Sequence, residues 1–164
     1  YAEFTMPATG SNLYMIWDYR KPTGISLNYD TDAYKACCSA IIAPELACGQ
    51  GQSGGYAYPA VYKVVLGSST GVVTLHFDAG IEPDRFVLEF DGSNVIDTGY
   101  RGAPSQQGAL NQALADLSQA SATIQGVGAG TVAFTKSTAT TEAKLSIYAP
   151  ITNSIWTTTV DCPV

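Results

Sequence analysis

From residue 56 onward the chain alternates apolar and polar residues over short stretches, the pattern of strands with one buried face. Residues 72–77 (VVTLHF) and 85–90 (RFVLEF) show this most clearly, and Asp91-Gly92 after them is a strong hairpin signal. Other β-branched and aromatic runs predict strands at 56–66, 95–96 and 155–160, and a further pair of strands at 131–135 and 144–148. The pattern predicts an all-β fold, an antiparallel β-sandwich of Ig-like or jelly-roll-like type.

One segment has helical periodicity instead. In residues 107–119 (QGALNQALADLSQ) apolar residues recur every three or four positions, at Leu110, Ala113, Leu114 and Leu117. We expect a short helix inserted between strands, with its apolar stripe covering an open end of the sandwich. The run GVGAG at 126–130 lacks the lysine and the strand–loop–helix context of a phosphate-binding loop, so we expect a turn there.

Before residue 56 the pattern is weaker. A strand-like start breaks at Pro7 and Gly10 and resumes in the apolar run LYMIW at 13–17. Residues 36–47 are expected to form a short helix or a cysteine-pinned loop, and GQGQSGG at 49–55 a flexible polar loop. The chain starts at Tyr1, so we expect that a signal was removed or that the sequence is part of a longer protein.

Composition excludes several classes of protein. Hydrophobic residues make up 46% of the 164 residues and charged residues 13%, and ten Tyr, two Trp and five Phe exclude a disordered tail. A net charge of −6 with eight Lys and Arg argues against nucleic acid as a partner, because a phosphate backbone needs a basic surface. No apolar run approaches the roughly 18 residues of a transmembrane helix, so no membrane insertion is expected.

The four cysteines, Cys37, Cys38, Cys48 and Cys162, predict disulfides and an oxidising, extracellular location. A bond between the adjacent Cys37 and Cys38 would strain the backbone. We therefore expect Cys162 to pair with one of these two and Cys48 with the other. The alternatives are four free buried thiols, or a zinc site for which His76 is the one further soft ligand.

Candidate catalytic residues are few, and we expect a non-enzymatic module, with a hydrolase domain as the remote alternative. His76 is the single histidine, and its place in VVTLHFD is typical of a sheet histidine with satisfied hydrogen bonds. The sequence contains no GxSxG motif. Acidic residues for glycoside cleavage are present, but no aromatic-flanked glutamate stands out among them.

The most distinctive stretch, FDAGIEPDRFVLEFDGSNVIDTGYRG at 77–102, holds two kinds of candidate site. A tight hairpin can bring Asp84 and Asp97 to one end of a sheet, where two carboxylates and loop carbonyls are a seat for Ca²⁺, with Asp78 and Asp91 as further candidates. The alternative is that each Asp caps a turn. Tyrosine beside Arg or Asp provides a stacking face and hydrogen bonds for a sugar, which suggests Tyr100, Arg101, Tyr19 and Tyr29 as ligand-binding residues. The alternative is that these tyrosines pack under loops.

Two parts of the sequence carry a family resemblance. FTMPATG and the apolar strand after it resemble the last hairpin of tandem immunoglobulin-like repeats in large bacterial surface adhesins. Residues 77–102, with the closing runs GAGTVAFTK and AKLSIYAPITNSIWTTTVDCP, resemble β-sandwich modules of bacterial surface proteins and of phage fibre and structural proteins. The resemblance covers roughly half the chain. It implies that residues 1–20 end a preceding repeat, the alternative being an N-terminal hairpin of this domain, and that residues 21–164 are the module.

The resulting hypothesis is a structural or adhesive module of an adhesin, fibre or filament, located outside the cell, on its surface or on a virion. It would pack on neighbouring copies or modules of the same protein, or bind a surface receptor. The apolar run at 13–17 supports packing, because such a strand left bare at a sheet edge recruits another strand. The alternative is a Ca²⁺-braced carbohydrate-binding module that binds surface glycans.

Overall fold

The structure is a computed structural model that describes residues 2–5, 12–15 and 43–163. The chain divides into two compact units, residues 1–42 and 43–164. In the first unit, β1 (Ala2–Thr5) pairs antiparallel with β2 (Asn12–Met15), and Ala2 lies opposite Met15. That this hairpin ends a preceding repeat stays a prediction. The module boundary expected at residue 21 and the residues Tyr19, Tyr29, Cys37 and Cys38 lie outside the described residues.

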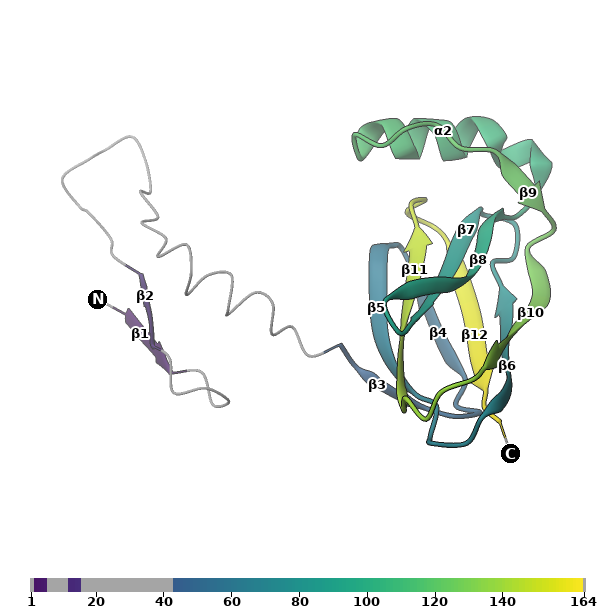
Figure 1. Cartoon of the computed structure of the whole chain (residues 1–164). Helices are drawn as coiled ribbons and strands as arrows, with labels where there is room; N and C mark the ends of the chain where they lie inside the picture. Colours follow the sequence, from purple (N-terminus) through teal and green to yellow (C-terminus); the bar gives the residue numbers. More distant parts are fainter. Residues whose placement is uncertain (1, 6–11, 16–42, 164) are drawn as a thin grey trace. The chain divides into compact units, whose positions relative to one another are not determined.

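The second unit is a β-sandwich of two facing sheets, as Figure 1 shows. The order in the four-stranded sheet is β10-β6-β12-β4, and in the six-stranded sheet it is β3-β5-β11-β7-β8-β9. Neighbouring strands are antiparallel except in the pairs β3–β5 and β8–β9. The strands are β3 (Glu45–Ala47), β4 (Gln52–Gly55), β5 (Ala57–Val65), β6 (Gly71–Asp78), β7 (Asp84–Phe90), β8 (Ser93–Arg101), β9 (Ile124–Gly126), β10 (Ala129–Lys136), β11 (Glu142–Ala149) and β12 (Ile155–Asp161). The predicted all-β sandwich is confirmed.

The core lies between the two sheets and consists of residues at alternate strand positions. Val73, Leu75 and Phe77 of β6 are buried from one sheet, and Phe86 and Leu88 of β7 from the other. The rings of Phe77 and Phe86 meet across the core with centroids 5.3 Å apart. The alternation that predicted these strands therefore also identifies their inward faces.

A helix covers one end of the sandwich. The helix α2 (Gln107–Asp116) follows a short 3₁₀ turn (Pro104–Gln106) and lies across the end of the sheets where β8 finishes (Figure 1). Leu110 and Leu114 are buried there against Tyr100, with Tyr58 and Ile124 at the margin. The predicted helix and its covering role are confirmed. Within the described residues, no helix is long and apolar enough to cross a membrane.

The Asp91-Gly92 hairpin has the predicted geometry. Asp91 has a φ of 49° and Gly92 a φ of 72°, the two positive values that a type I′ turn requires. Phe90 pairs with Ser93 across it. This turn therefore sets the register between β7 and β8.

Three expectations about individual strands are wrong. Residues 131–135 and 144–148 do not pair, because β10 pairs with β6 in one sheet and β11 with β5 and β7 in the other. Residues 45–47 form β3 rather than a helix or loop, since Leu46 enters the core and the backbone pairs with β5. The expected turn at 126–130 is shorter, because Gly126 ends β9 and Ala129 begins β10.

The flexible loop expected at 49–55 is wrong for residues 52–55, which form β4 along β12. Trp156 of β12 explains why this glycine-rich segment is a strand. Its indole Nε1 donates to the carbonyl of Gly55 at 2.8 Å, and its ring occupies the space that a Cβ at position 54 would need. Glycine at position 54 therefore makes room for a fully buried tryptophan.

A disulfide joins Cys48, after β3, to Cys162, after β12, with the Cα atoms 5.6 Å apart. The expected pairing of Cys162 with Cys37 or Cys38 is therefore wrong. The reason is that β3 and β12 finish at the same end of the two sheets, which places Cys48 within bonding distance. The bond links the two sheets covalently, and such a bond is compatible with an extracellular location.

Candidate functional site

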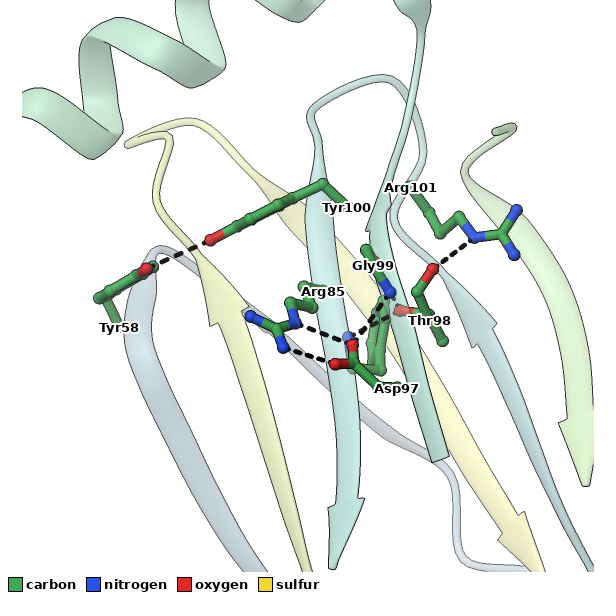
Figure 2. Close-up of polar contacts among 8 residues, drawn as sticks. Tyr58, Arg85, Asp97, Thr98, Gly99, Tyr100 and Arg101 are labelled. Atoms are coloured by element: carbon green, nitrogen blue, oxygen red, sulfur yellow. Dashed lines mark hydrogen bonds and ion pairs between the residues drawn. The ribbon is translucent and has the colours of Figure 1, made fainter. Parts of the chain in front are cut away.

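The stretch singled out by sequence, residues 77–102, forms the end of β6, the following loop and the β7–β8 hairpin. The two strands pair antiparallel, but the register shifts between Arg85 and Val87. Gly99 has a φ of 61°, which adds to this irregularity. Polar side chains gather at this irregular part of the sheet, as Figure 2 shows.

Arg85 and Asp97 form a bidentate ion pair on the solvent-facing side of these strands. Arg85 Nε donates to Asp97 Oδ1 at 2.8 Å, and Nη2 donates to Oδ2 at 2.5 Å (Figure 2). The backbone N–H of Gly99 also donates to Oδ1, at 3.0 Å. The hydrogen bonds from Arg85 hold the pKa of the Asp97 carboxyl below its usual value. The carboxylate therefore stays ionised and fixes the guanidinium, which also lies 5.6 Å from the ring centroid of Tyr148.

The ion pair borders an open hollow with a volume of about 350 Å³. The hollow is lined by Arg85 and Asp97 together with Thr123, which precedes β9, and Gln125 of β9. The hollow thus presents a guanidinium, a carboxylate, a hydroxyl and an amide. These groups are the donors and acceptors that a polar ligand such as a sugar binds.

Tyr100 also lines this hollow, but its ring is mostly buried, and the ligand-binding role suggested for it stays a prediction. The side chain is 5% exposed because α2 packs on it through Leu110 and Leu114. Its hydroxyl lies 3.2 Å from the hydroxyl of Tyr58 (Figure 2), and burial raises the pKa of Tyr100. Tyr100 therefore belongs to the contact between helix and sandwich.

Arg101 is held within the same hairpin rather than directed at a ligand. Its Nε donates to the carbonyl of Thr98 at 2.9 Å (Figure 2), and its guanidinium lies 5.8 Å from the ring centroid of Phe77. The ligand-binding role suggested for Arg101 stays a prediction.

Asp84, at the start of β7, is fully buried. The Oγ of Ser154, in the loop before β12, lies 2.6 Å from Oδ2 and 2.8 Å from Oδ1 of this carboxyl group. Burial raises the pKa of Asp84 to about 7, with a further contribution from the nearby charge of Glu82. Ser154 was not singled out in the sequence, because it lies 70 residues away from Asp84.

The other candidate carboxylates have partners in the protein. Asp78 accepts a hydrogen bond from the N–H of Gly80 at 2.8 Å, the turn-capping role foreseen as the alternative. Asp91 accepts one from the Thr138 hydroxyl at 2.8 Å. No group of three or more His, Cys, Asp or Glu side chains in the described part of the chain is arranged to hold a metal ion. Calcium binding at these residues stays a prediction. Comparing the melting temperature in calcium with that in chelator tests it.

His76 lies on the outer face of β6 between two neighbouring strands. Its Nδ1 lies 3.1 Å from Thr131 Oγ1 of β10, and its Nε2 lies 3.0 Å from Asp161 Oδ2 of β12. Both ring nitrogens therefore have a partner, as expected for a sheet histidine with satisfied hydrogen bonds.

Three exposed aliphatic residues lie at one end of the four-stranded sheet: Ile81 in the loop after β6, Val127 in the turn before β10 and Ile155 at the start of β12. Ile81 is 60% exposed, Val127 72% and Ile155 74%. We call these three the loop-end residues. The N–H of Ala79 donates to the carbonyl of Gly128 at 3.1 Å, which joins the first two loops.

The start of β12 lies at the same place. A Cβ at Gly80 would lie 3.8 Å from the carbonyl oxygen of Ile155, so the backbone before Ile81 runs past the start of β12. The sequence analysis passed over Ile81 and Val127 because they interrupt turn segments instead of extending an alternating strand, whereas Ile155 begins the strand predicted at 155–160. An aliphatic residue next to turn-forming Gly or Pro, as in GIEP and GVG, is a sequence pattern that could have identified Ile81 and Val127.

Comparison with known proteins finds similar folds among solved structures. The chain matches no protein-family model and no curated protein. It is similar to the pre-peptidase C-terminal domain of a Bacillus anthracis collagenase, at 11% identity and a TM-score of 0.46, over 72% of this chain and 93% of that one. It is also similar to CsCBM6-3 from Clostridium stercorarium, solved with cellobiose, at 11% identity and a TM-score of 0.32, over 70% and 76% of the two chains. Likeness at this level does not assign a function.

Proposed function

We propose that this chain is a non-catalytic structural module of an extracellular or virion-surface protein, and that it packs on neighbouring copies or modules of that protein. The observation that carries the proposal is the set of loop-end residues. Two loops and the first residue of β12 place Ile81, Val127 and Ile155 at one end of the sandwich, each more than half exposed. Exposed aliphatic residues that gather at one place mark a contact surface.

Two further features support this role. The Cys48–Cys162 disulfide closes the sandwich covalently, which suits an oxidising environment. The chain is poor in charged residues, at 13%, so few charged side chains are available to block contact with a neighbouring module. Packing through apolar loops would bury surface that the isolated module leaves in water.

Sedimentation velocity of the 164-residue chain over a range of concentrations tests the proposal. We expect the unmodified chain to self-associate. The triple variant Ile81→Thr, Val127→Thr, Ile155→Thr should raise the dissociation constant at least tenfold. Val72→Thr is the matched control, because Val72 is 58% exposed but is the second residue of β6, at the end of that strand opposite the loop that contains Ile81. A chain that stays monomeric up to about 1 mM, the weak end of specific association, contradicts the proposal.

A second candidate function is glycan binding at the hollow beside Arg85 and Asp97. The observation that favours it is the convergence of four polar side chains on one open hollow of about 350 Å³. A glycan array probed with the intact chain and with Asp97→Asn tests it. A specific hit that the variant loses supports this function, and an array without a hit contradicts it.

A further inference from the structure

We infer that β10 is the edge through which a second copy of this chain joins the four-stranded sheet, by antiparallel pairing of β10 with β10. This inference rests on the proposed function, because it names one of the surfaces through which copies would pack. Within residues 43–163, β10 pairs with β6 on one side and with no strand on the other. The backbone groups on its outer side therefore form no ladder with another strand of the described sandwich.

The length of β10 distinguishes it from the other edges of the described sandwich. It has eight residues, whereas the edge strands β3, β4 and β9 have three, four and three. Very short edges are one of the ways in which proteins prevent unwanted strand pairing. Among the four strands that end the two sheets, β10 is the longest.

The edge at β10 also lacks the usual chemical protection. Its sequence, AGTVAFTK, contains no proline and no acidic residue, and its single charge is turned away from solvent. Lys136 is fully buried, and its Nζ donates to the carbonyls of Ser69 and Thr138 at 2.8 Å each. By contrast, the β3 edge carries the exposed Glu45, paired with Lys63. Charged side chains of this kind block edge-to-edge pairing.

The side chains of β10 are self-complementary in one antiparallel register. With Ala133 opposite Ala133 of the second copy, Thr131 lies opposite Thr135 of the second copy, and the reverse pair follows by symmetry. All three are exposed on the outer face of the sheet. Thr–Thr pairs directly across two strands are favourable, and an isologous contact of this kind closes as a dimer.

The inner face gives an independent reason for the same pairing. Val132 and Phe134 point toward the core but are only partly buried, because they stand in the last strand of the sheet. Phe134 packs on Phe90 with ring centroids 5.5 Å apart. A strand added to β10 would place Phe134 of the second copy beside Val132 and would cover the open flanks of both side chains.

Charge exchange across this register tests the inference. The variant Thr131→Lys, Thr135→Lys places like charges opposite each other in the paired edge, and so does Thr131→Glu, Thr135→Glu. We expect each variant alone to self-associate with a dissociation constant at least tenfold higher than that of the unmodified chain. A one-to-one mixture of the two variants should restore the association. A variant that failed to fold could not be rescued by mixing, and a thermal melt of each checks the fold. The variant Ser68→Lys, Thr157→Lys is the control, with the same added charge on exposed positions away from β10.

Amide hydrogen exchange of residues 129–136 supplies a second readout, in which protection should rise with protein concentration. Concentration-independent protection overturns the inference, and so does a mixture that fails to recover association. If the lysine variant associates like the unmodified chain while the loop-end variant does not, the β10 inference fails and the proposed function stands. If the unmodified chain does not associate at all, both fail.

Discussion

Ser154 Oγ lies within hydrogen-bond distance of both carboxyl oxygens of Asp84, at 2.6 and 2.8 Å. The contact joins β7 of the six-stranded sheet to the loop that leads into β12 of the four-stranded sheet. It is fully buried, so the carboxyl group has exchanged water for one hydroxyl partner. The sandwich is thus linked at this end by a titratable pair and at the other by a disulfide.

The first prediction concerns pH. The pKa of Asp84 is about 7 in the folded protein, whereas an unfolded chain ionises aspartate near pH 3.9. Between these values the folded state keeps a proton that the unfolded state has lost, so the free energy of unfolding falls as pH rises from about 4 to about 7, by up to about 1.4 kcal/mol per pH unit. Urea unfolding at several pH values measures it.

Asp84→Asn should flatten this dependence, because the amide keeps an acceptor for Ser154 but does not ionise. The exposed Asp116→Asn is the control and should leave the slope unchanged. An Asp84→Asn variant whose stability still falls over the same window would show that another group causes the slope.

The second prediction concerns the disulfide. Cys48 and Cys162 are 114 residues apart, and opening a loop of that length should lower the free energy of unfolding by about 4–5 kcal/mol on the chain-entropy model. Denaturant unfolding of the double variant Cys48→Ser, Cys162→Ser against the oxidised protein measures the loss. Non-reducing peptide mapping should recover the peptide that joins the two cysteines. Recovery of Cys162 bonded to Cys37 or Cys38 contradicts the structure.

The third prediction compares two glycines. Gly54→Ala should destabilise the protein by about 1–3 kcal/mol, because the added methyl group meets the indole of Trp156. Gly108→Ala should stabilise it by up to about 1 kcal/mol, because the added methyl group would meet no neighbouring side chain or strand within 4 Å and the position is helical. Chemical denaturation of both variants measures the two signs. Equal effects of the two substitutions would mean that Trp156 does not pack on β4 as described.

The fourth prediction concerns the helix. Leu114→Ala should cost about 2–5 kcal/mol, because a fully buried side chain between α2 and Tyr100 is lost. The neighbouring exposed Ala115→Ser should stay within about 0.5 kcal/mol. Thermal or denaturant melts compare the two. A Leu114→Ala variant as stable as the control would mean that the helix does not cover the sandwich in solution.

The strands with clear alternation could be predicted because each side chain reports its own face. Val73, Leu75 and Phe77 are buried as the pattern of β6 requires, and Asp91-Gly92 makes the turn that its φ preferences favour. The helix followed from the spacing of Leu110 and Leu114 in the same way. In these segments local sequence and tertiary structure agree.

The parts that could not be predicted depend on residues distant in sequence. Gly54 forms a strand because a tryptophan about a hundred residues later occupies its side-chain space, and glycine carries no pattern of its own. Cys48 pairs with Cys162 because of β3, a strand of three residues. The same holds for the candidate site. Tyr100 was identified from its neighbours in the sequence, but its ring is buried because α2 packs on it.

The Cys48–Cys162 bond also determines how the module carries a mechanical load. The bond connects the chain just after the first strand of the sandwich to the chain just after its last strand. A pull applied before Cys48 and after Cys162 therefore passes through one covalent link and bypasses β4 to β12. Under tension the segment between the two cysteines keeps its length, and β4 to β12 begin to bear force only when that bond is reduced.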